Sequence, residues 1–188
     1  MTRQHLMIGL IATAAATRLL PHAPNFTPLL ALAIFAGQQL ANFRLTLAVL
    51  IPSMLLIDLP LALNHFTNDP SSTALLQIAL INGVVYASIA GLAWLSKIAG
   101  PRRGLHTSIV TTLGASIAFF SLTNFAAWLA FYPKSFTGLI ACYSNALPYF
   151  KNTWLSTLLY SGVLFGGLAL FDVISLRVRS RAQVTMKG

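Results

Sequence analysis

The segment from Asn124 to Asn152 holds the chain's densest group of side chains suited to binding a small molecule. It contains the single cysteine, three tyrosines, one tryptophan, three asparagines and two prolines. Asn124, Trp128 and Tyr132 follow one another at intervals of four residues, so on a helix they share one face. The next apolar segment repeats this spacing with Asn152, Ser156 and Tyr160. Two such stripes meeting at one membrane surface are typical of a pocket with apolar walls and a few hydrogen-bonding groups.

Three parts of the chain contribute to the predicted binding site. The first outer loop supplies His22, Asn25 and Phe26, and Asp58 is expected beneath it. The other walls come from seven residues of the central segment: Asn124, Trp128, Tyr132, Tyr143, Asn145, Tyr149 and Asn152. In this hypothesis the aromatic rings stack on a flat part of the ligand, the asparagines orient it, and residues 132–151 form a lid. The scarcity of charge favours a largely neutral ligand that contains a ring.

Asp58 is one of only three acidic residues in the chain, and it lies inside an apolar run. A carboxylate inside a membrane costs about 2.5–3.5 kcal/mol on insertion scales, so it usually faces a partner or a wet cavity. The candidate partners are Arg18, His65 and a substrate. An ion pair that ties two helices together is the alternative to a binding role.

The composition excludes a soluble domain. Of the 188 residues, 56% are hydrophobic and 8% are charged, whereas a soluble domain carries about 25% charged residues. The net charge is +9, but the basic residues form no stripe interleaved with aromatic residues, so nucleic acid is not an expected partner. They lie at the ends of apolar runs, where they anchor helices in a lipid bilayer.

The elements expected to position these residues are six transmembrane helices in one all-α domain, residues 1–188. The spans are expected at about 6–20, 28–41, 45–63, 73–96, 106–131 and 153–175. Residues 136–150 are too few to span a bilayer and predict a surface or re-entrant helix between the fifth and sixth spans. The basic tail, 177–188, is expected to be frayed. A signal peptide is the alternative interpretation of the first apolar segment.

The basic residues predict the orientation. With both termini in the cytoplasm of a bacterium, nine of the twelve basic residues face the inside of the inner membrane: Arg3, Arg44, Lys97, Arg102, Arg103, Arg177, Arg179, Arg181 and Lys187. Arg18, Lys134 and Lys151 remain outside. This asymmetry agrees with the positive-inside rule, and it puts the polar loops 21–28, 64–72 and 132–151 on the outer face.

Cofactor and metal chemistry have little support in the sequence. There is no glutamate, no zinc-protease motif and no glycine-rich phosphate loop followed by Lys and Ser or Thr. The four histidines are dispersed, so neither a metal nor a cofactor is expected. Cys142 with His22 or His65 would be the components of a nucleophile and base, but no spacing places them together.

Several stretches resemble an uncharacterised family of small bacterial multi-pass membrane proteins to which a transport label has been given. They are RLLPHAPNFTPLLALAIFAG (18–37), TNFAAWL (123–129), YPKSFTGLIACYSNALPYFKNTWL (132–155) and LFG (164–166). The six-span layout is also similar to the S components of energy-coupling-factor (ECF) vitamin transporters. In that group, loops and the later helices form an outward pocket for a vitamin.

The resemblance to S components also implies partner proteins. Alanines on the first helix of those proteins contact a transmembrane coupling subunit that works with ATPases, and Ala12 and Ala16 match that pattern. The chain departs from the small multi-pass family at two positions. Ala23 stands where proline is common, and an acidic residue is common near Thr157, which leaves any charge-dependent role of that helix in doubt.

Three functions are therefore carried forward from the sequence. The first is a substrate-binding subunit or small transporter for an organic nutrient. The second is a structural or assembly protein of the inner membrane that binds no small molecule. The third, ranked well behind, is a membrane enzyme that uses Asp58, Cys142 and a histidine.

Overall fold

A computed structural model describes residues 2–68, 72–100 and 105–185, and over these ranges the chain is helical with no strand. The all-α prediction is thus confirmed. The elements in chain order are α1 (Arg3–Ala16), the 3-10 turn η1 (Thr17–Leu19), α2 (Leu29–Gln39), α3 (Phe43–Asn68), α4 (Ser72–Ala99), α5 (Leu105–Phe131) and α6 (Phe136–Thr185).

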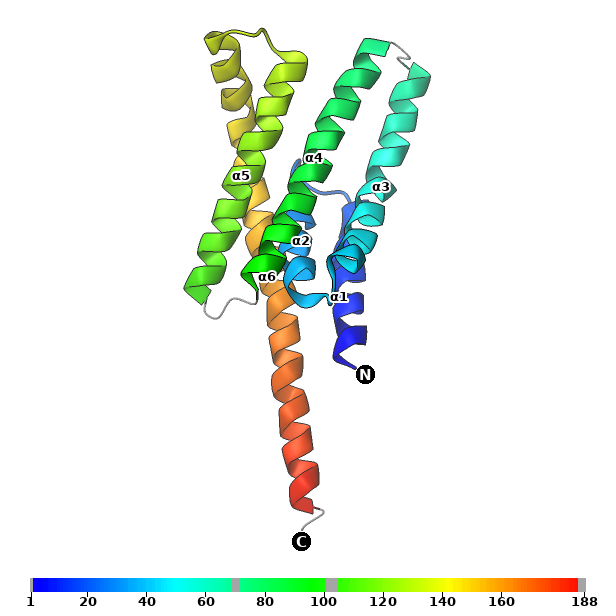
Figure 1. Ribbon diagram of the computed structural model, residues 1–188, viewed down its shortest axis with the longest axis vertical. Coiled ribbons are helices and arrows are strands. Elements are labelled where there is room, and N and C mark those ends of the chain that lie inside the picture. The colour runs from blue at the N-terminus through cyan, green and yellow to red at the C-terminus, as the bar shows by residue number, and fades with distance from the viewer. Residues whose placement is uncertain (1, 69–71, 101–104, 186–188) are drawn as a thin grey trace.

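Helix α2 forms the core of the bundle. Nine of its eleven residues, Leu29 to Gly37, are buried, and the helix packs against α1, α3, α4, α5 and α6. Its sequence, LLALAIFAGQQ, is apolar on every side until the final pair of glutamines. A helix that is apolar all round must be enclosed by other elements, and Figure 1 shows α2 lying inside the other helices.

Two long helical hairpins rise around α2. Helices α3 and α4 form one, and α5 and α6 form the other. The end of α3 and the start of α4 lie at the same end of the molecule as the turn between α5 and α6 (Figure 1). The N-terminal end of α1 and the C-terminal end of α6 lie toward the opposite end. The outer faces of the hairpins carry large apolar side chains that are mostly exposed, among them Leu76, Ile98 and Leu170. This arrangement suits a molecule surrounded by lipid.

The structure does not support six full spans. Three helical stretches are long and apolar enough to cross a bilayer, Leu76–Ala99, Val110–Phe131 and Phe136–Val178. The bent pair Phe43–Leu56 and Asp58–Asn64 within α3 would make a fourth. Helices α1 and α2 have 14 and 11 residues, whereas a span needs about 20. The apolar helices indicate a membrane protein, but the prediction of six spans was too high for the part of the chain that is described.

The prediction of a separate surface or re-entrant helix at 136–150 is also wrong. Helix α6 runs without a break from Phe136 to Thr185, with Pro148 inside it. Its 50 residues correspond to about 75 Å, more than twice the hydrocarbon thickness of a bilayer. Its C-terminal part therefore continues beyond the bundle (Figure 1). The basic tail expected to be frayed is helical through Thr185.

The bend in α3 has a sequence cause. The two parts of α3, which meet near Ile57, differ in direction by 42°. Pro60 has no backbone N–H to bond the carbonyl of Leu56, and its ring presses on that carbonyl. The bend falls beside Asp58, so the backbone changes direction at the one acidic residue of this helix.

The tightest contact between α2 and α4 is at Gly37. A methyl group built there would overlap the carbonyl oxygen of Ala93 and would lie 3.1 Å from Cβ of Ser96. We expect Gly37→Ala to lower the free energy of unfolding by about 2–3 kcal/mol, because overpacking forces the two helices apart. Thermal unfolding in detergent measures the change.

Gly83→Ala is the matched control, because a methyl group at Gly83 of α4 meets nothing within 4 Å. That variant should be as stable as the parent or more stable by about 0.5–1 kcal/mol, since alanine favours a helix. Equal stability of the two variants would contradict the close approach of α2 to α4.

Candidate functional site

The connection between α1 and α2, residues 20–28, is the only long non-helical segment in the described part of the chain, and we call it the loop platform. Figure 1 shows it about halfway along the two hairpins, well below their turns. Leu20 to Asn25 are exposed. Three prolines restrict the backbone. Asn25 adopts a left-handed conformation with φ of 60°, which asparagine tolerates better than most residues.

One side of the loop platform is attached to α6. The side-chain amide of Asn152 donates to the carbonyl oxygen of Pro24 at 3.0 Å. The hydroxyl of Tyr160 lies 2.9 Å from that of Thr17, and its ring centroid lies 6.3 Å from that of Phe26. The polar stripe that the sequence places on this helix therefore faces the loop.

The other side is fixed by an ionic cluster of Arg18, Asp58 and Tyr86. The guanidinium of Arg18 in η1 lies 3.6 Å from the carboxylate of Asp58 in α3. The hydroxyl of Tyr86 in α4 donates to the same carboxylate at 2.9 Å. Arg18 also donates to the carbonyl oxygen of Ser53 at 2.6 Å. Among the partners expected for Asp58, Arg18 is present, and the side chain of His65 lies outside the described residues.

The two charged side chains of the cluster differ in how far they are exposed. The side chain of Arg18 is 7% exposed and that of Asp58 is 23% exposed. Arg18 therefore faces protein almost entirely, while the carboxylate keeps an open side near the loop platform. A charged pair of this kind holds three elements in register, because separating it would leave a charge in an apolar bundle.

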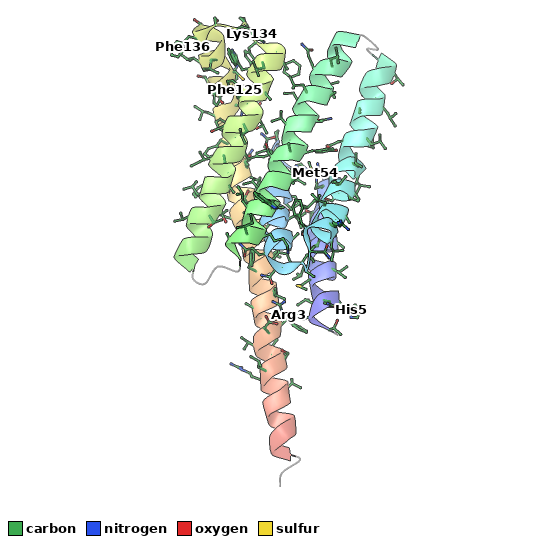
Figure 2. The ribbon with its side chains drawn as sticks, in the orientation of Figure 1. Arg3, His5, Met54, Phe125, Lys134 and Phe136 are labelled. Carbon is green, nitrogen blue, oxygen red and sulfur yellow. The ribbon has the colours of Figure 1, made fainter. Side chains whose placement is uncertain are left out.

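Seven other polar side chains form hydrogen bonds at the end of the α5–α6 hairpin. Four of them donate to backbone carbonyl oxygens: Asn124 to Phe120 (2.8 Å), Trp128 to Pro133 (2.9 Å), Cys142 to Asn124 (3.3 Å) and Tyr143 to Ser121 (2.7 Å). The side-chain amide of Asn145 donates to the hydroxyl of Tyr132 at 3.3 Å. Lys134 donates to the carbonyl oxygens of Trp128 and Tyr132 at the end of α5. Figure 2 shows Lys134 and Phe136 at this turn.

The predicted binding residues thus fall into two groups. His22, Asn25, Phe26 and Asn152 lie in or on the loop platform, and Asp58 lies next to it through Arg18. Asn124, Trp128, Tyr132, Tyr143 and Asn145 bond within their own hairpin. Tyr149 is 44% exposed on α6. The structure does not bring all eleven residues around a single pocket, and a binding role for each remains a prediction.

Cavities lie elsewhere in the bundle. An apolar groove of about 860 Å³ runs between α1 and α3 and is lined by Ala12; Ala16 is exposed one helical turn further on. A polar cavity of about 290 Å³ lies between α2, α5 and α6. Sequence reasoning missed this cavity, although the adjacent Gln38 and Gln39 at the end of an apolar run were a signal for it. No cluster of three or more metal-ligating side chains occurs in the described ranges.

Thr17, Tyr86 and Tyr160 were not among the predicted site residues. Each bears a hydroxyl on a different element, and only the fold brings Thr17 to Tyr160 and Tyr86 to Asp58. Thr157, near which the resemblance to small multi-pass proteins implies an acidic residue, is fully buried and donates to the carbonyl oxygen of Thr153. An acidic side chain there would face the packed interior of the bundle.

The ionic cluster can be tested by a double-mutant cycle. We expect Arg18→Met to lower the free energy of unfolding by about 3 kcal/mol, at the low end for a buried pair because Asp58 is partly exposed. Thermal unfolding in detergent measures it.

The double variant Arg18→Met, Asp58→Leu should recover much of that loss, since no charge is then left without a partner. If the two substitutions are simply additive, Arg18 and Asp58 are not coupled in the folded protein.

Comparison with known proteins identifies the chain by its family alone. No curated protein and no solved structure matches it. One family model matches residues 1–180, which is nearly the whole chain. The chain therefore belongs to the family of unknown function DUF6580.

Proposed function

We propose that this protein is a membrane substrate-binding or transport subunit for a small organic nutrient, with the loop platform as the floor of an outward-facing pocket. The observation that carries the proposal is the exposure of Leu20 to Asn25 halfway along helices that are long and apolar enough to cross a membrane. Lipid does not tolerate irregular backbone at that depth, because its polar groups need water or protein partners. An exposed loop there requires a space filled with water or solute.

The proposed pocket lies between the upper parts of the two hairpins. Helix α3 packs on α4, and α6 packs on α5, but α3 and α6 make no extensive contact within the described residues. Helix α1 lies between α3 and α6 and ends at the loop platform. The two hairpins meet where α4 packs on α5, and the proposed pocket lies beyond the point where α1 ends. Substrate sites of membrane transporters commonly lie near the bilayer midplane, where helices are interrupted.

The groups beside the platform indicate the ligand class. Tyr160, Tyr86 and Phe26 supply aromatic surface, and Asn152 supplies an amide. The charges of Arg18 and Asp58 neutralise one another. These features favour a neutral molecule that has a ring and a few hydrogen-bonding groups. The proposed site keeps the loop and α6 residues expected from the sequence and adds Tyr86 and Tyr160.

The direction of the pocket follows from the basic residues. Arg44 and Lys97 lie at the end opposite the hairpin turns, and the ammonium group of Lys97 donates to the carbonyl oxygens of Leu40 and Ala41 at 3.1 Å each. The positive-inside rule places this end in the cytoplasm of a bacterial inner membrane. In this topology α3 to α6 cross the bilayer, while α1 and α2 are shorter helices that meet at the loop platform.

A coupling subunit is part of the proposal. The groove between α1 and α3 is apolar and lined by Ala12 and Ala15. Small residues let another helix approach closely in a membrane. This surface supports the expected contact of Ala12 and Ala16 with a transmembrane partner that works with ATPases. The protein would then bind the substrate, and the ATPases would supply the energy.

Cysteine labelling tests whether the platform is wet. Cys142 is the only cysteine, so Cys142→Ala gives a background without thiols. In that background we expect His22→Cys and Asn25→Cys to react in intact cells with a membrane-impermeant maleimide. Mass spectrometry of the purified protein measures the adduct.

Leu159→Cys is the control, since Leu159 is 54% exposed on α6 next to Tyr160 but belongs to the apolar outer surface. It should stay unlabelled until the membrane is dissolved. Lack of reaction at both loop positions, with full reaction after denaturation, would contradict the proposed outward pocket.

Native mass spectrometry tests for the ligand itself. Protein purified in mild detergent from its own host should carry a reproducible small-molecule adduct. Asn152→Ala and Tyr160→Phe should each weaken its retention by about fivefold to tenfold, as expected for the loss of one hydrogen bond.

Trp128→Ala should keep the adduct, because Trp128 bonds Pro133 within the α5–α6 turn. Loss of the adduct in Trp128→Ala alone would indicate that the ligand binds at the turn between α5 and α6 and not at the loop platform. A protein that carries only lipid, together with a partner that crosslinks to residues 132–151, would favour the assembly function instead.

A further inference from the structure

A second polar region lies at the opposite end of α2 from the loop platform. It is the cavity of about 290 Å³ between α2, α5 and α6, beside the start of α1. Most of its lining residues are polar or charged: Arg3, Gln38, Gln39, Thr111, Thr112, Ser161 and Asp172. The apolar remainder includes Ile34 and Phe165.

This cavity is more polar than the two cavities that lie higher or farther to the side in the bundle. A cavity of about 350 Å³ between α4 and α5 has Ser88 as its one polar lining residue, and the groove between α1 and α3 is mostly apolar. Polar side chains inside a membrane bundle generally face one another, water or a transported solute. A polar cavity large enough for several water molecules is expected to be filled.

Ser161 gives independent support for an occupant. Its hydroxyl oxygen is buried and has no hydrogen-bond partner among the described atoms, although the residue lines the cavity. Buried hydroxyl groups in folded proteins nearly always have a partner. Because protein atoms cover this oxygen almost completely, a polar molecule in the cavity would bond it only after the Ser161 side chain turns toward the cavity.

A set of contacts that we call the latch joins three residues of the cavity wall. The guanidinium of Arg3 lies 3.2 Å from the carboxylate of Asp172 and donates to the amide oxygen of Gln39 at 3.1 Å. These residues belong to α1, α6 and α2. Figure 2 shows Arg3 at the end of the bundle, where α6 continues alone. The side chains of Arg3 and Asp172 are 47% and 42% exposed, so the latch lies at the surface of the bundle and outside its buried core.

We infer that this cavity is the inner half of a solute pathway, a binding site for a small, uncharged, hydrogen-bonding solute that the latch closes toward the cytoplasm. The inference rests on the proposed function and assigns that transport path an inner site. Arg3 and Asp172 neutralise one another, and the remaining polar groups are amides and hydroxyls, which suit an uncharged solute. Helix α2 separates this site from the loop platform, so solute must pass along α2 to cross.

The test measures access to the cavity without needing the solute. In the Cys142→Ala background, Ser161→Cys places the only thiol in the cavity wall. The probe is a cationic, membrane-impermeant methanethiosulfonate, applied to inside-out membrane vesicles and separately to intact cells. The rate of thiol modification is followed by mass spectrometry. Thr112→Cys, in α5 and 3% exposed, is a second reporter on another wall if Ser161→Cys folds poorly.

Opening the latch should accelerate the reaction. With the latch intact, the reporter should react slowly and only from the cytoplasmic side. Arg3→Gln or Asp172→Asn should raise the rate about fivefold, the effect expected for losing one part-exposed ion pair. Arg3→Lys should keep the slow rate, because it preserves the charge. Arg44→Gln, an exposed basic residue at the same end that does not line the cavity, should leave the rate unchanged.

Three results would overturn the inference. If neither reporter reacts in any latch variant, yet both react after denaturation, the cavity holds no water. If the rate is the same with and without the latch, Arg3 and Asp172 do not close it. Reaction from the outer side alone would contradict an inner site. None of these results affects labelling of His22→Cys from outside, so failure of the inner site is distinguishable from failure of the outward pocket.

Discussion

The enclosure of α2 is the constraint on which the rest of the structure depends. Eleven residues that are apolar on every side cannot face water, and buried small residues such as Ala31, Ala33 and Gly37 let other helices approach closely. The five other helices therefore gather around it. Because α2 is only about 16 Å long, both of its ends fall within the height of the longer helices. The chain must turn at those two depths, and the polar residues of the bundle gather there.

Each end of α2 is stabilised by polar contacts, which are mostly buried at the first end and more exposed at the second. At the first end, Arg18, Asp58 and Tyr86 hold η1, α3 and α4 together, while Asn152 and Tyr160 hold the loop to α6. At the second end, Lys97 bonds the carbonyl oxygens that follow α2, and Arg3 joins Gln39 to Asp172. In an apolar bundle such groups are stable only when paired, so they also fix how the helices are placed.

These two polar regions make transport a coherent proposal. A single outward pocket would explain the exposed loop but not the polar cavity at the other end of α2. A purely structural bundle would explain the ion pairs but not the polar cavity. In the proposed function, the short central helix is the barrier, and the polar regions at its two ends are the two sites of access. The hairpin end that is richest in tyrosine and asparagine acts instead to tie α5 to α6.

The sequence by itself determined the chemical class of the molecule and several local features. A chain with 8% charged residues and long apolar runs has to form lipid-facing helices, and Pro60 predicts a bend beside Asp58. The loop from Pro21 to Pro28 was predicted from the sequence, and Arg18 was among the partners expected for Asp58. Hydropathy did not reveal that residues 136–150 continue into α6, or that α1 and α2 are too short to span, because it does not record where a helix ends inside a bundle. Only the tertiary structure decided which polar groups meet. Tyr160 meets Thr17 beside the loop platform, Tyr86 meets Asp58, and Asp172 meets Arg3, although these residues lie far apart in the sequence. Packing around α2 sets the height of each helix in the bundle and the direction in which its side chains point.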